Sequence, residues 1–222
     1  MELHKIYFQK FKRKLFPATY GHERWNKVDE KWYSEIHDAN YLLHENFIEF
    51  FKQKDNIKTV LEVGCGTGVY PIKYKNLFTE YKYTGIDFSK KNIEFCKKNS
   101  NFEFLCADFI ELNLDKKYDL VFSHAVIDHV YDIDKFISKI VKMIKKYGYI
   151  NSYRGYFPEM KKHKMNWVDE DGCYYNDLAV KQLKKTLLKN GLTENEFQIR
   201  PQTSGQKDKN MDVQTVIEII KK

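Results

Sequence analysis

The stretch TVLEVGCGTG, residues 59–68, decides the fold of this chain. Residues 59–63 form a short apolar run with β-branched residues, which is typical of a buried strand. Gly64, Gly66 and Gly68 follow, and glycine lets the backbone turn tightly and approach a ligand closely. We therefore predict a strand that ends in a ligand-binding loop.

Outward from this stretch, apolar runs alternate with helical patterns along the chain. Further strands are expected at residues 81–87, 102–108, 118–123, 147–153, 196–200 and 213–220. Helices are expected at residues 71–78, 89–99, 132–146 and 176–191. Because such alternation builds a mainly parallel sheet, ligands should bind beyond the carboxyl ends of the strands.

Two segments fall outside this alternation. Residues 1–57 have helical patterns and are a predicted N-terminal helical cap, whereas residues 58–222 form the predicted main domain. Residues 154–175 are a long insert within that domain, and long loops in compact domains are often functional. We expect the cap and the insert to cover and shape the substrate site.

Composition restricts the class of protein. The 222 residues carry a formal net charge of +7 that is spread along the chain, which favours a solvated surface over attraction to nucleic acid, a membrane or an anionic substrate. The densest basic segments, residues 10–14 and 161–164, are too short to indicate nucleic-acid binding by themselves. No apolar run approaches the ~18 residues of a membrane span, and the N-terminal residues do not resemble a secretory signal. We expect a cytoplasmic monomer or homodimer.

The cysteines indicate no metal site. Cys65, Cys96, Cys106 and Cys173 include no C-x-x-C pair, so neither zinc nor a redox dithiol is predicted. Cys65 lies within the glycine loop, where we expect its small size and its backbone to matter more than its thiol.

Acidic residues at the ends of the expected strands restrict the ligand of the glycine loop. Glu62 would repel a pyrophosphate and would favour an ammonium or sulfonium group. Residue 69 is valine, so the third glycine of the dinucleotide fingerprint is missing, which disfavours a nicotinamide oxidoreductase. Asp87 ends the second expected strand, where a carboxylate accepts hydrogen bonds from ribose hydroxyls.

Residues near the third strand suit a purine. Asp108 could accept a hydrogen bond from an exocyclic amine, and Phe88 or Phe109 could pack against a purine face. An amino acid, a cationic sulfur, a ribose and an adenine occur together in S-adenosylmethionine. We therefore predict S-adenosylmethionine as the cofactor and S-adenosylhomocysteine as the product.

Four motifs in succession, VLEVGCGTG, YTGIDFS, CADF and YDLVFSHAVIDHV, resemble those of class I S-adenosylmethionine-dependent methyltransferases. The resemblance is strong over about residues 57–150. It implies a Rossmann-like α/β fold with a seven-stranded, mainly parallel sheet, helices on both faces and an antiparallel last strand. It also implies that the glycine loop holds the amino-acid part of the cofactor, that Asp87 binds ribose and that Asp108 contacts adenine. Tyr147-Gly148 departs from the family's usual glycine-rich turn, which should alter the turn more than the chemistry.

His124, Asp128 and His129 follow the fourth expected strand and are the candidate catalytic residues. Methyl transfer to a hydroxyl or ammonium group requires removal of a proton, and an imidazole with a pKa of about 6.5 suits that task. Either histidine could be the general base, and structural roles stay open for both. Asp128 could orient a histidine or cap the next helix, and Ser123 offers its backbone to the cofactor.

The acceptor site is expected to involve the insert and the cap. Arg154 and Tyr156 follow the fifth strand, and arginine there could clamp a phosphate or carboxylate, or form an ion pair within the insert. His37 and Trp25 of the cap could close over the site, although aromatic residues in a helix are more often core. All four are candidate substrate-binding residues.

The methyl acceptor is less defined than the cofactor. The segment SHAV after the fourth strand lacks the Asn- or Asp-Pro-Pro-aromatic motif that is common in nucleic-acid amino-methyltransferases. We expect a small-molecule methyltransferase that acts on oxygen, with an anionic, phosphorylated or sugar-derived metabolite as one option. N-methylation of a small molecule or RNA stays open, as does a non-catalytic S-adenosylmethionine-binding module.

Overall fold

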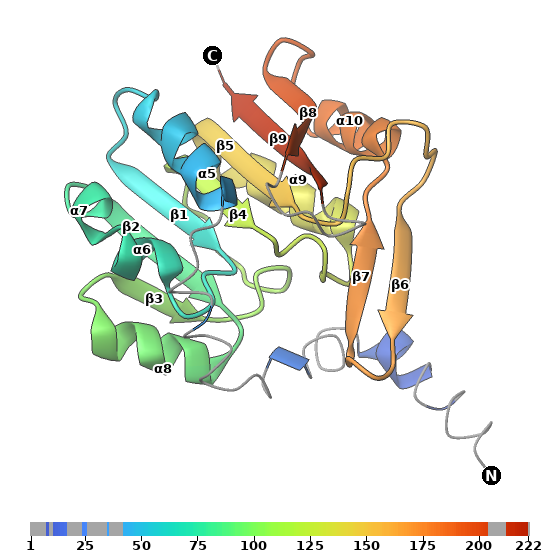
Figure 1. The fold of residues 1–222 in the computed structure, drawn as a ribbon, viewed down its shortest axis with the longest axis horizontal. Helices are drawn as coiled ribbons and strands as arrows, with labels where there is room; N and C mark the ends of the chain where they lie inside the picture. Colours follow the sequence, from blue (N-terminus) through green and yellow to red (C-terminus); the bar gives the residue numbers. More distant parts are fainter. Residues whose placement is uncertain are drawn as a thin grey trace.

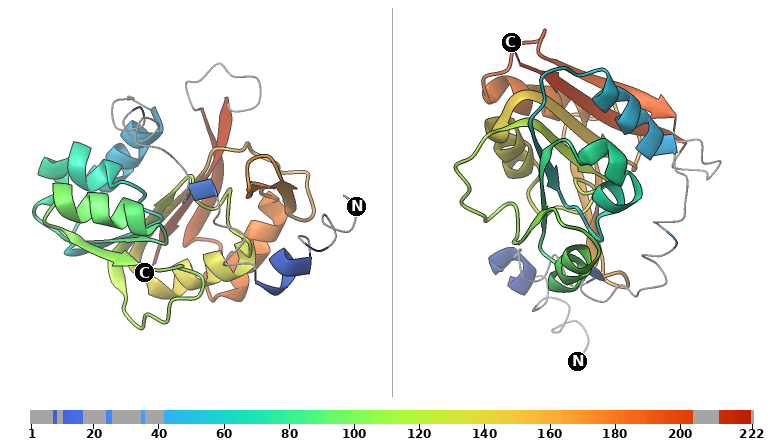
Figure 2. Two further views of the ribbon diagram at one scale, coloured as in Figure 1. Left: turned by 90° about the horizontal axis from the view of Figure 1, so that it is seen from below. Right: turned by 90° about the vertical axis from the view of Figure 1, so that its left-hand side faces the viewer.

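The computed structural model describes residues 8, 11–16, 24–25, 35, 42–203 and 212–221. A seven-stranded sheet in the order β3-β2-β1-β4-β5-β9-β8 forms the centre, with helices on both faces (Figures 1 and 2). Only β9 runs antiparallel to the other strands of this sheet. The predicted α/β fold with an antiparallel last strand is confirmed.

The element order follows the expected pattern, although the helix expected at residues 71–78 is divided into two and the helix expected at residues 176–191 begins at Val180. The strands of the sheet are β1 (Thr59–Val63), β2 (Lys82–Asp87), β3 (Glu103–Cys106), β4 (Tyr118–His124), β5 (Ile144–Ser152), β8 (Phe197–Thr203) and β9 (Val213–Ile220). The helices are α5 (Leu42–Lys52), α6 (Val69–Lys73), α7 (Lys75–Phe78), α8 (Lys90–Asn99), α9 (Ile133–Met143) and α10 (Val180–Lys189). A separate hairpin joins β6 (Lys164–Val168) to β7 (Cys173–Asp177).

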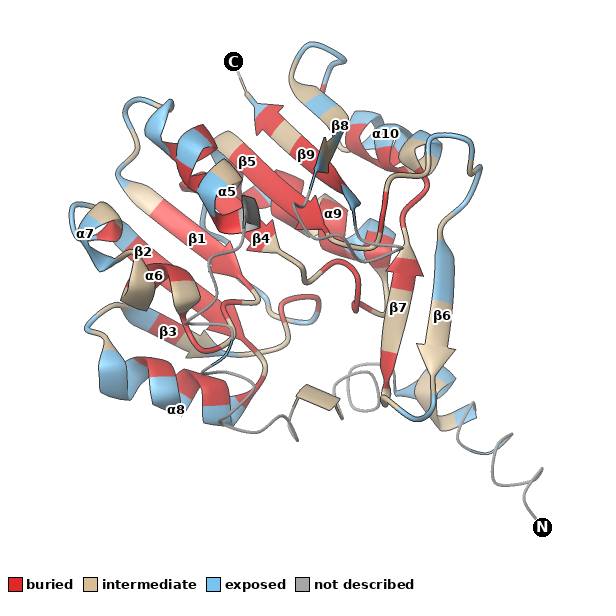
Figure 3. Ribbon diagram, in the orientation of Figure 1, coloured by how far each residue is buried: buried red, intermediate tan, exposed pale blue. Residues whose placement is uncertain are grey.

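Each face of the sheet buries its own apolar core (Figure 3). Val60 and Leu61 are neighbours on β1, yet they belong to different cores because successive side chains of a strand point to opposite faces. The core of Leu61 includes α9 and α10, and the core of Val60 includes α5 to α8. The carboxyl ends of the parallel strands therefore lie between two packed helical layers.

Helix α5 contributes to this packing directly. Phe47 stacks on Phe122 of β4 with ring centroids 4.2 Å apart, and Phe51 stacks on Phe78 of α7 at 5.3 Å. Helix α5, which the sequence places in the cap, thus contributes Phe47, Ile48, Phe50 and Phe51 to one of the two cores. The division into a cap of residues 1–57 and a main domain stays a prediction.

The expected helix over residues 132–146 ends earlier than predicted. It begins after Asp132, whose side chain accepts a hydrogen bond from the backbone N–H of Lys135, and ends at Met143. Ile144 continues the apolar spacing of the helix but pairs with Tyr118 as the first residue of β5. Sheet pairing therefore overrides the local periodicity at this point.

The insert is more regular than expected. Its residues 164–168 and 173–175 belong to the β6–β7 hairpin, whose turn contains Gly172 with a φ of +64°. The backbone N–H of Asn176 on β7 donates to the carbonyl of Asp128 at 2.8 Å. The hairpin is thus attached to the segment that follows β4.

Candidate active site

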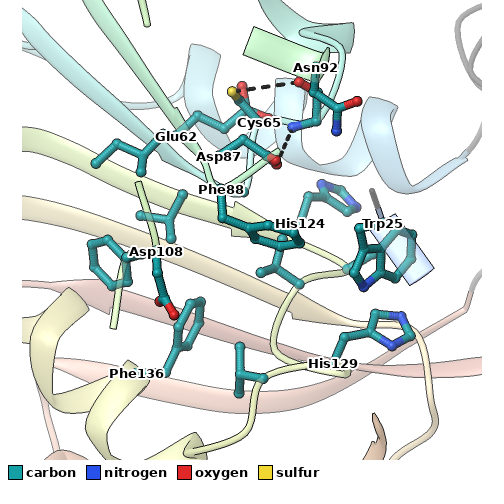
Figure 4. Close-up of a pocket in the computed structure, with 18 of the residues that line it drawn as sticks. Trp25, Glu62, Cys65, Asp87, Phe88, Asn92, Asp108, His124, His129 and Phe136 are labelled. Atoms are coloured by element: carbon teal, nitrogen blue, oxygen red, sulfur yellow. Dashed lines mark hydrogen bonds between the residues drawn. The ribbon is translucent and has the colours of Figure 1, made fainter. Parts of the chain in front are cut away.

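A cavity of about 570 Å³ lies at the carboxyl ends of β1, β2, β3 and β4. Its acidic end is lined by Glu62, Asp87 and Asp108. Its aromatic end is lined by Trp25, His129, Tyr153 and Tyr175. Figure 4 shows Trp25 and His129 on one side of the cavity and Glu62 and Asp108 on the other. One cavity therefore brings together residues from the glycine loop, three strand ends and the hairpin.

The glycine loop needs glycine for two reasons. Gly64, Gly66 and Gly68 have φ angles of +76°, +52° and +74°, a region that other residues rarely adopt. A Cβ on Gly64 would also lie 2.3 Å from a methyl group of Val126. The backbone N–H groups of Gly64 and Cys65 donate to the carbonyl of Ile86, which fixes the loop against β2.

Asp87 joins this loop to the next helix. One carboxylate oxygen accepts a hydrogen bond from the backbone N–H of Gly66 at 2.9 Å, and the other accepts from Ser89 at 2.8 Å. Ser89 is the N-cap of α8, and its side chain accepts a hydrogen bond from the backbone N–H of Asn92. Each oxygen of a carboxylate has a second lone pair, so Asp87 retains the capacity to accept further hydrogen bonds from a ligand.

Glu62 is a buried carboxyl group at the acidic end. The hydroxyl of Tyr83 donates to Glu62, and no basic side chain among the described residues pairs with it. Burial raises the pKa of Glu62 well above its usual range, and the nearby Asp87 raises it further. A cation bound beside Glu62 would favour the ionised form.

The far part of the acidic end combines a carboxylate with aromatic walls. Asp108 accepts hydrogen bonds from the backbone N–H of Ile110 and from the hydroxyl of Tyr131, both at 2.8 Å. Phe109 packs edge-on against Phe136, and both rings line the cavity together with Phe88. This arrangement provides flat apolar surfaces next to a hydrogen-bond acceptor.

His129 is a neutral imidazole whose tautomer is determined by its partners. Its Nδ1 lies 2.6 Å from the carbonyl oxygen of Tyr174, which can only accept, so Nδ1 carries the proton. Its Nε2 therefore has a lone pair and accepts from the hydroxyl of Tyr153 at 3.0 Å. Burial, assisted by the charges of Arg24 and Arg154, lowers the pKa of His129 to about 4.

His124 contacts a second tyrosine. Its Nδ1 lies 2.5 Å from the hydroxyl of Tyr70. Burial raises the pKa of Tyr70, so the hydroxyl stays protonated and can donate to Nδ1 or accept from it. The other ring nitrogen, Nε2, is buried and has no hydrogen-bond partner among the described residues. Burial, assisted by His44, lowers the pKa of His124 to about 3.

Asp128 neither orients a histidine nor caps a helix, in contrast to the two roles considered from the sequence. It is fully buried and accepts hydrogen bonds from the Ser152 hydroxyl at 2.6 Å and from the Tyr153 backbone at 3.3 Å. Burial raises the pKa of Asp128 to about 7, against the effect of these hydrogen bonds. Asp132 is the residue that caps α9. Asp128 thus holds the end of β5, and with it the backbone of Tyr153.

Several predicted site residues do not line the cavity. Ser123 is fully buried, and its hydroxyl donates to the carbonyl of Val63 at 2.9 Å. Arg154 pairs with Asp177 at 3.2 Å, which is the ion pair within the insert that the sequence left open, and Tyr156 also lies outside the lining. His37 is outside the described residues. Trp25 does line the cavity, with its ring edge-on to His129 at 4.8 Å.

Sequence reasoning missed three residues of the aromatic end. Tyr153 directly follows β5, and its position at a strand end could have identified it. Arg24 pairs with Asp171 of the hairpin turn at 2.6 Å, and the hydroxyl of Tyr175 donates to the same carboxylate at 2.6 Å. No local signal marks Arg24 or Tyr175, because their position depends on how the hairpin meets the N-terminal part of the chain.

Comparison with known proteins gives a family and curated relatives. The model of a methyltransferase domain family matches residues 54–215. The chain is 32% identical over 146 residues to a ubiquinone biosynthesis O-methyltransferase of Pelagibacter ubique, and this match covers 57% of the chain and 60% of the relative. It is 33% identical over 97 residues to a malonyl-[acyl-carrier protein] O-methyltransferase of Calditerrivibrio nitroreducens, and this match covers 41% of the chain and 36% of the relative. The chain therefore matches only part of the length of these relatives.

Solved structures show the same fold over nearly the whole chain. The magnesium protoporphyrin IX methyltransferase of Synechocystis PCC 6803, crystallised with bound S-adenosylmethionine, superposes with a TM-score of 0.58 at 18% identity. That match covers 96% of this chain and 97% of the other. An S-adenosylmethionine-dependent methyltransferase of Clostridium acetobutylicum gives a TM-score of 0.55 at 15% identity and covers 94% and 99% of the two chains.

Proposed function

Because the chain belongs to the methyltransferase domain family, we propose that it transfers a methyl group from S-adenosylmethionine to an oxygen atom of a small-molecule acceptor. The family match confirms the class I S-adenosylmethionine-dependent methyltransferase predicted from the motifs. The observation that carries the proposal is the single cavity that joins the glycine loop and its acidic residues to a neutral histidine.

The acidic end fits S-adenosylmethionine group by group. Glu62 is a buried carboxyl group that has no basic partner among the described residues. It could therefore pair with the ammonium group of the cofactor. Asp87 can accept from ribose hydroxyls while it holds the glycine loop, and the aromatic walls near Asp108 suit adenine. When bound there, S-adenosylmethionine would supply an electrophilic methyl group on a sulfonium sulfur.

At the aromatic end, His129 is the proton acceptor in our proposal. The Nε2 lone pair faces the hydroxyl of Tyr153, so an acceptor hydroxyl could pass its proton to His129 through Tyr153 or directly. The Tyr174 carbonyl would hold the resulting imidazolium by its Nδ1–H. His124 is less suited to this role because burial lowers its pKa further than that of His129, to about 3.

The low basicity of His129 restricts the acceptor. An imidazole whose pKa is about 4 removes a proton best from a hydroxyl that is itself acidic, such as a phenol or an enol. The curated relatives are O-methyltransferases, which supports oxygen over nitrogen. An ammonium acceptor would in addition meet the cationic side chain of Arg24 at this end.

The proposal is tested by an acceptor screen. The full chain is incubated with S-adenosylmethionine carrying an isotopically labelled methyl group and with matched sets of phenols, carboxylic acids, aliphatic alcohols and amines. We expect labelled product from an acidic hydroxyl compound, and mass spectrometry locates the label on oxygen. Transfer to amines alone would instead indicate an N-methyltransferase. A folded protein that binds S-adenosylmethionine but methylates none of the sets would favour a non-catalytic binding module.

A further inference from the structure

Exposed apolar side chains gather in one short segment of the described chain. Phe8, Phe11, Leu15 and Phe16 are 56%, 57%, 54% and 58% exposed. Phe8, Phe11 and Leu15 are three and four residues apart, so they share one face of a helix. We call Phe8, Phe11, Leu15 and Phe16 the N-terminal apolar patch.

The described residues of this segment, 8 and 11–15, are helical, and the segment is held on its other side. The backbone N–H of Phe16 donates to the carbonyl of Lys12 at 2.8 Å, and the ammonium of Lys12 lies 4.4 Å from the ring centre of Phe8. Arg13 pairs with Asp169 at 3.2 Å and stacks on the ring of Trp167 at 4.3 Å. Figure 1 shows the described part of the segment, in dark blue, beside the turn of the β6–β7 hairpin. Arg13 thus anchors the helix while the apolar patch faces solvent.

The charge of the segment indicates what the patch contacts. Residues 8–16 contain four basic residues, Lys10, Lys12, Arg13 and Lys14, and no acidic residue. Apolar side chains among lysines are typical of a helix that lies in the interface of an anionic lipid membrane. None of the described helices is long and apolar enough to cross a membrane, so such a contact would be superficial.

We propose that the N-terminal apolar patch docks on an anionic phospholipid surface, with Phe8, Phe11 and Leu15 inserted among the lipids and the neighbouring lysines at the headgroups. The hairpin turn connects this surface to the cavity. Its Asp169 holds Arg13 of the patch helix, and its Asp171 holds Arg24 of the cavity lining. A docked molecule would therefore have its aromatic end close to the membrane. The proposal does not depend on the proposed methyl transfer.

The test is co-sedimentation of the full chain with lipid vesicles. Vesicles of phosphatidylcholine alone are compared with vesicles that also contain phosphatidylglycerol, at low and high salt. We expect binding to the anionic vesicles to be at least about tenfold tighter, and to weaken with salt because surface charges are screened. The double substitution Phe8→Ser/Phe11→Ser should reduce that binding by about tenfold or more. Both side chains are exposed, so circular dichroism should show an unchanged fold.

The chain offers a matched control in Phe95. It is an exposed phenylalanine on α8, a helix that also carries Lys90, Lys91, Lys97 and Lys98. Phe95→Ser should leave vesicle binding unchanged. The proposal would be overturned by absence of binding to the anionic vesicles, or by equal loss of binding in the Phe95 variant. Self-association that the Phe8/Phe11 variant abolishes, without lipid binding, would also overturn it and would assign the patch to a second copy of the chain.

Discussion

The two ends of the cavity are built in different ways. At the acidic end, Asp87 binds the backbone of Gly66 and Ser89, so short segments next to the strand ends form most of the site. At the aromatic end, the partners of His129 come from the hairpin and from the residue directly after β5, and Arg24 comes from the N-terminal part of the chain. The acidic end is therefore encoded locally, whereas the aromatic end depends on tertiary assembly. Substitutions at one end should affect cofactor binding, and those at the other should affect turnover or acceptor binding.

The largest effect is expected from Gly64→Ala, which would disrupt the acidic end. The new Cβ would lie 2.3 Å from a Val126 methyl group and would add strain at a φ of +76°. We expect S-adenosylhomocysteine binding to weaken by about 100-fold or more. A left-handed backbone alone costs a residue with a side chain ~1–2 kcal/mol, and the clash with Val126 adds to that cost. Isothermal titration calorimetry measures the change.

Two variants separate strain from clash in this prediction. Gly66→Ala introduces a Cβ with no heavy atom within 4 Å, so only the strain of its φ of +52° should remain, and binding should weaken by at most about 5- to 30-fold. Gly64→Ala combined with Val126→Ala should recover part of the lost affinity. Equal effects at Gly64 and Gly66 would contradict the contact with Val126.

The next effect concerns the aromatic end and separates the two histidines. His129→Gln should lower kcat by about 10²–10⁴-fold on an acceptor found by the screen, because the proton acceptor is lost. S-adenosylhomocysteine affinity should stay unchanged. His124→Gln should lower kcat by less than about tenfold, since His124 has the lower pKa of the two histidines, about 3, and is not the proton acceptor of the proposal. A larger loss of kcat in the His124 variant than in the His129 variant would mean that His124 is the general base.

The positions of these residues differ in how well the sequence predicts them. The bounds of β1, the role of Ser89 as N-cap and the position of Asp87 beside the glycine loop all follow from local patterns. The start of β5 at Ile144 does not, because an apolar residue at helical spacing is equally compatible with a strand until Tyr118 pairs with it. Local information is sufficient where the contacts are local.

The aromatic end shows why the hydrogen-bond partners of the site residues could not be predicted from the sequence. The sequence identifies both histidines from their place at the end of the fourth expected strand, but their hydrogen-bond partners, Tyr174 and Tyr70, are distant in sequence. Arg154 was expected at the site because it follows a strand, yet Asp177 of the hairpin holds it outside the cavity lining. Arg24 takes the position near the cavity because Asp171 is within reach.

A smaller effect should appear in the pH dependence of cofactor binding. The pKa of Glu62 is raised in the free protein, so part of this carboxyl group is protonated until the pH exceeds that pKa. The ammonium group of S-adenosylhomocysteine would favour the ionised form, and binding should release up to one proton. Affinity should rise with pH by at most about tenfold per unit and level off above the raised pKa.

Calorimetric titrations at one pH in buffers of different ionisation enthalpy measure the released protons. Glu62→Gln cannot ionise at this position, so the variant should release fewer protons than the wild type when S-adenosylhomocysteine binds. Equal proton release in the wild type and in the Glu62 variant would mean that the cofactor does not interact with Glu62.

The smallest effect should come from the hairpin turn. Asp171→Asn removes the charge that holds Arg24 and Tyr175, and we expect KM for the acceptor to rise by about threefold, as is typical of an exposed ion pair. Steady-state kinetics should show little change in kcat. Asp177→Asn is the matched control, because it frees Arg154 outside the cavity lining and should leave KM unchanged.

The separation of the two ends is tested most directly by titrating S-adenosylhomocysteine into the wild type, Asp87→Ala and His129→Gln by calorimetry. We expect equal binding by the wild type and the His129 variant, and binding weakened by about tenfold or more in the Asp87 variant, which loses both its ligand contacts and its hold on the glycine loop. Absence of binding by the folded wild type, or equal binding by all three proteins, would mean that the acidic end is not the cofactor site.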